Sequence, residues 1–258
     1  MICGQYRCLF VHIPKTAGQS VEQVFLRLLG LTWETRGPLL LRGNDDPRLG
    51  PPRLAHLTAA EYVSCGYLTP AEFGSLFKFS IVRNPWDRIV SEYKYRRHPV
   101  TMDFKTYLFK RLPSPGWSEA YRHIIPQHDF LYDEAGRLLV DFVGRFERLQ
   151  ADFDVVCTRL GIPSTPLPRA NRSLEEGRPR SFRELRRWVR RAIWSREREH
   201  TFPHYTEYYD DESREYVGHL YRKDVQAFSY AFDERAASVA PAPSPPAAMP
   251  RRPRPEAP

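Results

Sequence analysis

The chain has 258 residues, 41% of them hydrophobic, and carries a formal net charge of +8. This length and apolar content suffice for one α/β domain with a sizeable core. No apolar run approaches the roughly 20 residues that span a bilayer, the N-terminus lacks a signal-peptide pattern, and four scattered cysteines fit a reducing compartment. We therefore expect a cytoplasmic protein, and its basic balance favours polyanionic partners in general.

The first predicted elements form a strand, a turn and a helix. A short apolar run, Cys8 to Ile13, indicates a buried strand, and after a small-residue turn apolar residues recur at helical spacing as far as Gly30. The start of a helix leaves backbone N–H groups unpaired and carries partial positive charge. The turn is therefore predicted to bind a phosphate or sulfate, with these contacts: Lys15, Thr16, Ala17, Gly18, Gln19 and Ser20.

The order of residues in this turn differs from that of a nucleoside-triphosphate loop. In a Walker A loop the lysine follows the glycines and a hydroxyl residue reaches magnesium. Here Lys15 precedes Gly18, and no Gly-Lys-Ser/Thr sequence follows. The alternative is an ordinary strand-to-helix turn with an exposed lysine.

A second strand–helix corner is predicted at residues 77–95. The run FKFSIV has strand length, and Asn84 and Pro85 are typical of a helix start. This arrangement places Arg83 at the carboxyl end of the strand and Arg88 and Ser91 in the first helical turns. Ligands of open α/β sheets bind outside the carboxyl ends of the strands, so the two corners can face each other.

Arginine and a hydroxyl at the second corner suit a terminal phosphate. The alternative is that Arg83 and Arg88 pair with acidic neighbours such as Asp87 and Glu92, which we expect of Arg88 rather than Arg83. A nucleotide with phosphates at both its 5′ and 3′ positions would bridge two such anion sites on one sheet. We expect no metal, because no His/Cys/Asp/Glu cluster has metal-ligand spacing.

Three further stretches complete the organisation. Leu138 to Glu147 indicates another buried strand, followed by a helix that ends at Gly161, and residues 205–232 carry a helical pattern. Between them, Ser181 to His200 predicts an arginine-rich helix, either a solvated face or a contact for an anionic acceptor or a membrane surface. Residues 236–258 read as a disordered Pro/Ala/Arg-rich tail after a single domain, residues 1–235.

The amino-acid sequences of the two corners resemble those of a known family. HIPKTAG is similar to the 5′-phosphosulfate loop, and VRNPWDRIVSEY to the 3′-phosphate motif, of carbohydrate sulfotransferases of the heparan and chondroitin type. The resemblance spans roughly residues 5 to 233. It implies a P-loop-NTPase-like parallel sheet flanked by helices, with 3′-phosphoadenosine 5′-phosphosulfate as donor and no metal. It places the 3′-phosphate on Arg83 and Ser91, and Asn171 and Ser173 in a loop that closes over the nucleotide.

Sulfuryl transfer to a hydroxyl also needs a base. His56 opens the segment HLTAAEY between the two corners, and that segment resembles a recurring stretch of the family without its usual preceding lysine. A neutral imidazole suits the role, and the alternative is a helix-capping or core histidine. Glu22 and Glu92 are further carboxylates to consider, although both fit an exposed helix face. His12 is expected to pack and to orient the loop.

The resemblance implies transfer to a carbohydrate or glycolipid hydroxyl, and the acceptor and oligomeric state stay open. Animal members of the family are typically membrane-anchored Golgi enzymes. This chain departs from that pattern, so we expect a cytoplasmic bacterial enzyme. The alternative is a non-catalytic basic protein that binds an anionic polymer or nucleic acid. No sequence pattern of a nucleic-acid-reading module is present.

Overall fold

The computed structural model describes residues 1–168, 202 and 204–233. Asn171, Ser173, the arginine-rich segment 181–200 and the tail 236–258 lie outside the described residues. Among those described, no helix has both the length and the apolar character that crossing a membrane requires.

A four-stranded sheet in the order β1-β2-β3-β4 organises the chain. β2 (Cys8–Val11), β3 (Phe77–Val82) and β4 (Phe142–Arg145) run parallel, and the short β1 (Ile2–Cys3) pairs antiparallel with β2. The parallel strands end at the same edge of the sheet, which brings the residues after β2 and β3 together. The chain thus has a mixed α/β fold with a mostly parallel sheet.

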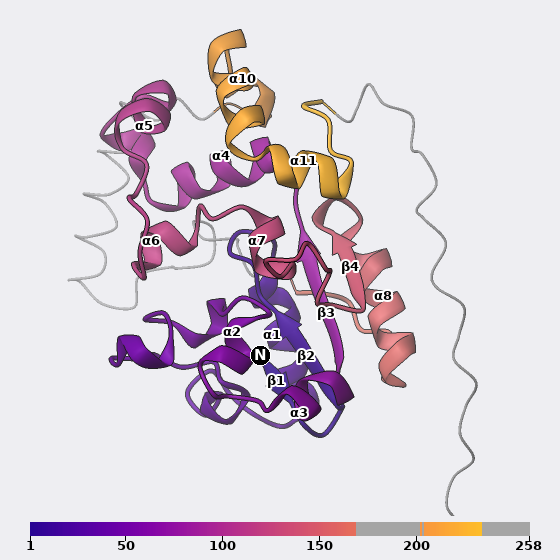
Figure 1. Ribbon diagram of the computed structural model, residues 1–258. Helices are drawn as coiled ribbons and strands as arrows, with labels where there is room; N and C mark the ends of the chain where they lie inside the picture. The colour runs from indigo at the N-terminus through magenta and orange to yellow at the C-terminus, as the bar shows by residue number, and fades with distance from the viewer. Residues whose placement is uncertain (169–201, 203, 234–258) are drawn as a thin grey trace, which may run out of the picture.

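The helices lie around this sheet in separate groups (Figure 1). The group near β1 and β2 contains α1 (Gly18–Leu28), α2 (Glu61–Ser64) and α3 (Pro70–Ser75), whereas α8 (Leu149–Leu160) lies beside β4. Beyond the carboxyl end of β3 lie α4 (Pro85–Tyr95), α5 (Phe104–Lys110) and α10 (Asp211–Leu220). The remaining helices are α6 (Glu119–Arg122), α7 (Gln127–Leu131) and α11 (Arg222–Phe228).

Both faces of β2 are buried, as the continuous apolar run predicts for a parallel strand. Phe10 packs with Phe79 and Phe25 on one face, and Leu9 and Val11 join a second apolar cluster on the other. A third cluster, around Trp86 and Tyr93 of α4, fixes that helix against α5 and α10. The loops after β2 and β3 are therefore anchored on rigid elements.

Several predicted boundaries differ from the structure. The first strand ends at Val11 rather than Ile13, because the chain already turns there and the Ile13 carbonyl accepts a hydrogen bond from Thr16. The third strand covers only Phe142–Arg145, since Leu138 forms an isolated bridge with Tyr132 instead of joining the sheet. The C-terminal helical pattern is divided into α10 and α11 at Tyr221. The prediction for β3 is confirmed at both ends.

Candidate active site

The loop between β2 and α1 has a strained backbone. Lys15 and Ala17 adopt positive φ angles of 71° and 66°, the left-handed region that residues with a Cβ rarely occupy. Such strain costs about 1–3 kcal/mol for each residue and clusters at active sites and ligand-binding loops. These two left-handed residues bend the loop around the N-terminus of α1, as an anion-binding loop requires.

The N-terminus of α1 is open to an anion. Ala17 occupies the capping position, no side chain caps the helix and its first turn holds no acidic residue. The Thr16 hydroxyl donates to the Ile13 carbonyl at 2.8 Å, so this side chain stabilises the turn. Gln19 is exposed, and the buried Ser20 hydroxyl has no hydrogen-bond partner among the described residues. The backbone N–H groups and Ser20 therefore remain for a ligand.

Lys15 lies partly buried beside this helix start. Its Nζ is 3.8 Å from the ring centroid of Tyr95, the last residue of α4. Burial lowers the pKa of Lys15 to about 8, with Glu92 opposing that shift and Arg83 adding to it. A partly desolvated ammonium binds an anion more strongly than an exposed one does, because less water screens the charge.

Arg83 joins the two corners. Its Nη1 donates to the Lys15 carbonyl at 3.1 Å, and its guanidinium lies 4.0 Å above the ring of Phe146. Nε and Nη2 both lie 2.8 Å from the same oxygen of Asp87. Ser91, one helical turn beyond Asp87, has no side-chain hydrogen bond among the described residues. The second corner thus places an arginine and an available hydroxyl beside the first.

The expectation that Arg88, rather than Arg83, pairs with an acidic neighbour was wrong. The Arg88 guanidinium is buried and donates to three backbone carbonyls, those of Pro14, Ile125 and His123, at 2.8–3.1 Å. Asp87 lies instead on the side of α4 that faces Arg83. Arg88 is therefore a structural residue. It connects the loop between β2 and α1, called the anion loop below, to the segment after α6.

Gln127 is a residue that sequence analysis missed. Its side-chain amide accepts from the backbone N–H of Arg83 at 2.8 Å and donates to the Arg83 carbonyl at 2.7 Å. Asp224 of α11 accepts from the backbone N–H groups of Gln127 and His128. These contacts fix the backbone of Arg83, and no local pattern around Gln127 indicates them.

His12 lies directly beneath the anion loop. Its Nδ1 is 2.6 Å from Glu22 Oε1, and its ring occupies the space next to Gly18. The prediction that His12 packs beside the loop is confirmed. The expectation of an exposed Glu22 was wrong, because the carboxylate is buried against the imidazole, which lowers its pKa.

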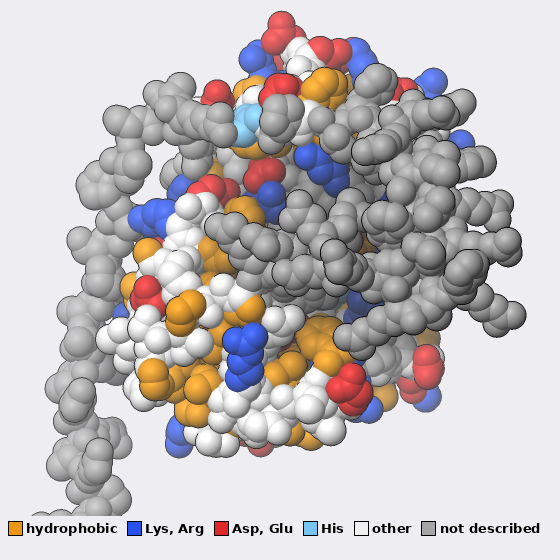
Figure 2. Space-filling model, turned by 180° about the vertical axis from the view of Figure 1, so that it is seen from behind, with side chains coloured by type: hydrophobic (Ala, Val, Ile, Leu, Met, Phe, Trp, Pro, Cys, Tyr) orange, Lys and Arg blue, Asp and Glu red, His pale blue; other side chains and the backbone are white. Residues whose placement is uncertain are grey.

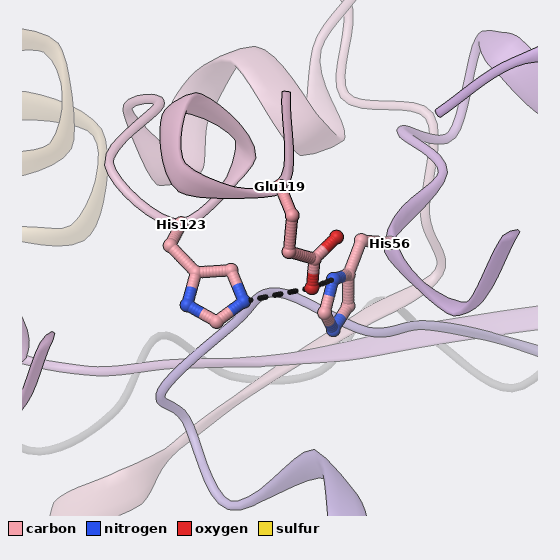
Figure 3. A group of neighbouring side chains, drawn as sticks. All are labelled: His56, Glu119 and His123. Carbon is pink, nitrogen blue, oxygen red and sulfur yellow. Dashed lines mark hydrogen bonds and ion pairs between the residues drawn. The ribbon is translucent and has the colours of Figure 1, made fainter. Parts of the chain in front are cut away.

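A second imidazole–carboxylate group follows (Figure 3). His56 Nδ1 and His123 Nε2 each lie 3.0 Å from Glu119 Oε1, and the His56 ring stacks edge-on against His12 with centroids 4.9 Å apart. Burial lowers the pKa of His56 to about 4, partly offset by Glu119. His56 is therefore neutral at physiological pH, with the electronic form that a general base needs.

Glu92 is the last of a series of contacting side chains that runs from His56 through Glu119 and His123 towards Lys15. Its carboxylate lies 2.7 Å from His123 Nδ1 and 2.6 Å from Arg96 Nε, and these partners lower its pKa despite burial. The expectation of an exposed Glu92 was therefore wrong. No sequence pattern indicates that Glu92 is buried, because Glu92 and His123 come from segments that are far apart in the chain.

His56, Glu119 and His123 are residue types that bind metals, and one donor atom of each lies within 4.8 Å of the others. Sequence spacing did not indicate this cluster, because His56 is distant in the chain. The His123 Nε2 contact with Glu119 is also a hydrogen bond at 3.0 Å, and His56 Nδ1 lies at the same distance from that oxygen.

Comparison with known proteins identifies the family. The profile described as "Sulfotransferase family" matches residues 1–231, which includes both anion corners and the imidazole–carboxylate group. Neither the curated proteins nor the solved structures gave a significant match.

Proposed function

Because the chain belongs to the sulfotransferase family, we propose that it transfers a sulfuryl group from 3′-phosphoadenosine 5′-phosphosulfate to a hydroxyl of a carbohydrate or glycoconjugate. The observation that carries this proposal is the contact of Arg83 with the Lys15 carbonyl, which sets two anion corners side by side. A donor with phosphate groups at both ends of its nucleoside spans such a pair. The parallel sheet and the loop at the start of α1 support a P-loop-NTPase-like architecture.

In this proposal the loop binds the 5′-phosphosulfate. Lys15, the N–H groups of residues 16–19 and Ser20 neutralise the phosphate that leaves, whereas Arg83 and Ser91 hold the 3′-phosphate. Preorganised positive charge of this kind stabilises charge that develops in the transition state, and one such donor is worth about 10²–10³-fold in rate. Asn171 and Ser173 remain proposed nucleotide contacts outside the described residues.

The acceptor hydroxyl attacks sulfur in line with the leaving phosphate. The new bond joins the acceptor oxygen to sulfur, the bond from sulfur to the phosphate oxygen breaks, and adenosine 3′,5′-bisphosphate leaves. The hydroxyl proton passes to His56, the buried neutral imidazole nearest the loop histidine His12. Positioning and charge neutralisation supply most of the catalysis, as in phosphoryl transfer.

The acceptor class is a proposal from charge and family. A net charge of +8 favours an anionic carbohydrate or glycolipid. On the described part of the face in Figure 2, basic side chains are interspersed with acidic and apolar ones, which gives no support there for a polyanion-binding protein without catalysis.

Isothermal titration with adenosine 3′,5′-bisphosphate tests this function, with adenosine 5′-monophosphate and ATP as comparisons. We expect binding that depends on the 3′-phosphate, followed by transfer of labelled sulfate to a member of an oligosaccharide panel. Replacement of His56 by alanine should remove turnover and leave bisphosphate binding within about twofold, because the base contributes 10²–10⁴-fold only to the chemical step. Equal or absent binding of all three nucleotides would overturn the proposal.

A further inference from the structure

Two imidazoles share one carboxylate oxygen beside the proposed reaction centre. Glu119 Oε1 lies 3.0 Å from Nδ1 of His56 and 3.0 Å from Nε2 of His123. An ionised carboxylate only accepts hydrogen bonds. Both nitrogens must therefore present a proton to Glu119, since two lone pairs facing this oxygen would repel it.

His123 lies between two carboxylates. Its Nδ1 lies 2.7 Å from a Glu92 oxygen while its Nε2 faces Glu119, so both ring nitrogens point at carboxylates. The hydrogen bonds and charges of these imidazoles keep the pKa of both carboxyl groups below its usual range. His123 thus bridges the carboxylates of Glu92 and Glu119 and holds Glu119 beside His56.

His56 meets the condition as a neutral ring. It is 6% exposed, and burial lowers the pKa of its imidazole to about 4. A neutral imidazole carries one proton, which the carboxylate draws to Nδ1. The Nδ1 contact with Glu119 is close but imperfectly aligned for a hydrogen bond, as is common for catalytic contacts before the substrate binds. In Figure 3 the other ring nitrogen points away from Glu119.

We propose that Glu119 is a positioning residue of the transfer reaction, which holds the proton of His56 on Nδ1 and leaves the lone pair of Nε2 to accept the proton of the acceptor hydroxyl. This inference rests on the proposed function. When Nε2 takes that proton, His56 becomes an imidazolium ion whose new charge faces Glu119. The proton then leaves to solvent with the sulfated product.

The surroundings of His56 keep it in place for this role. Arg122 Nη2 donates to the His56 carbonyl at 2.6 Å and also contacts Glu61, which fixes the backbone. On the other side, His56 packs edge-on against the His12 ring, which also lies next to Gly18 of the anion loop. The charged and titratable groups around the pair are these: His12 with Glu22, His123 with Glu92, and Arg53, whose Nε lies 3.6 Å from Glu119 Oε1.

The tautomer of His56 is measurable without any catalysis. In the full chain labelled with ¹⁵N-histidine, long-range ¹H–¹⁵N correlation spectra at neutral pH should show His56 protonated on Nδ1 and bare on Nε2. Glu119→Gln should weaken or reverse this preference, whereas Asp129→Asn should leave it unchanged. Asp129 is a matched control, because its carboxylate also lies 3.0 Å from an imidazole nitrogen, that of His128, and is exposed rather than buried. Protonation of wild-type His56 on Nε2 would overturn the proposal.

Kinetics then separate positioning from folding or donor binding. With 3′-phosphoadenosine 5′-phosphosulfate and a heparosan tetrasaccharide as probe acceptor, Glu119→Gln should lower kcat at least about tenfold, a fraction of what a positioned base supplies. The Kd for adenosine 3′,5′-bisphosphate should stay within twofold, and Glu119→Asp should recover part of the rate. Equal loss of kcat and of bisphosphate binding would contradict the proposal.

A bound metal is the competing use of this cluster, and it gives a different outcome. If a chelator abolishes wild-type turnover and Zn²⁺ restores it, Glu119 acts as a ligand and the positioning role is wrong. Failure of the proposed function is recognised separately, because bisphosphate binding would then lack its dependence on the 3′-phosphate while the His56 tautomer could still be read.

Discussion

The imidazole of His12 occupies the place that a side chain at Gly18 would need. A Cβ on Gly18 would lie 2.1 Å from two atoms of the His12 ring, and the ring cannot retreat freely. Glu22 holds its Nδ1, Phe10 stacks on it with centroids 5.6 Å apart, and His56 contacts its other side. The glycine of the anion loop is therefore set by a histidine from the preceding strand end.

We expect Gly18→Ala to destabilise the protein by about 1–3 kcal/mol, because an overpacked methyl group must displace the His12 ring or the loop. The same change in a His12→Ala background should cost less, giving a coupling free energy of about 0.5–3 kcal/mol in a double-mutant cycle. Urea unfolding of the four proteins measures it. Additive effects would show that the contact exerts no constraint.

Lys15→Ala should abolish detectable sulfuryl transfer and weaken binding of adenosine 3′,5′-bisphosphate, because the loop loses its only full charge. The rate loss expected for one charge-stabilising donor is at least about 10²-fold. Lys110→Ala removes an exposed lysine at the end of α5 and is the matched control. Transfer at the wild-type rate by the Lys15 variant would place the leaving phosphate elsewhere.

Binding of the bisphosphate should take up a proton above pH 8. Burial lowers the pKa of Lys15 from 10.5 to about 8 in the free protein, and a bound anion favours the charged amine. The contribution of Lys15 to affinity should thus be constant below pH 7, and affinity should fall by up to about tenfold for each pH unit above 8. Titration calorimetry in two buffers of different ionisation enthalpy measures the proton uptake.

The lowered pKa of Lys15 also determines how the free energy of unfolding changes with pH. Between pH 8 and 10.5 the unfolded chain holds more protons on residue 15 than the folded chain does, so this lysine makes the free energy of unfolding rise with pH in that window. Lys15→Arg stays charged throughout this range and should lose both pH effects. Their persistence in that variant would assign them to another group.

Arg83→Ala should weaken binding of adenosine 3′,5′-bisphosphate by roughly 10–150-fold, the value of one hydrogen bond to a charged group. Binding of adenosine 5′-monophosphate should change little. Asp87→Asn should have the opposite effect and strengthen bisphosphate binding, because Asp87 now competes for the Arg83 guanidinium. Arg137→Ala, at an exposed arginine paired with Asp133, is the control.

Arg88→Leu should lower the free energy of unfolding by at least about 3 kcal/mol. The leucine leaves three buried carbonyls, those of Pro14, Ile125 and His123, without their donor, and each such group costs about 1–3 kcal/mol. Guanidinium chloride unfolding measures the change, with Arg137→Leu as the exposed comparison. A shift as small as in that comparison would contradict the structural role given to Arg88.

The sequence predicted the elements whose signals are local. β3 agrees at both ends because an apolar run stops at Arg83, and the Asn84 side chain does accept from the Trp86 N–H as an N-cap should. The parallel strands then placed the two corners together. These features depend on residues that are neighbours in the chain, which is why pattern and spacing sufficed.

Long-range pairing explains what could not be predicted. The burial of Glu92 depends on His123, and the orientation of His56 depends on Glu119, and both partners come from a stretch around α6 without a strong pattern. A carboxylate on an amphipathic helix is usually exposed, so composition alone argues against burial. Only the three-dimensional structure shows that the imidazole of His123 contacts the buried carboxylate of Glu92.

The support of Arg83 has a consequence for how the protein is made. Gln127 holds the Arg83 backbone, Asp224 holds Gln127, and the Asn84 side chain donates to the carbonyl of Ala231. At about 5–20 residues per second, a ribosome needs roughly 10–40 s between synthesis of the anion loop and of these last contacts. The growing chain therefore exposes Arg83 well before it can hold this side chain in place, so the proposed nucleotide binding would be among the last properties that the protein acquires.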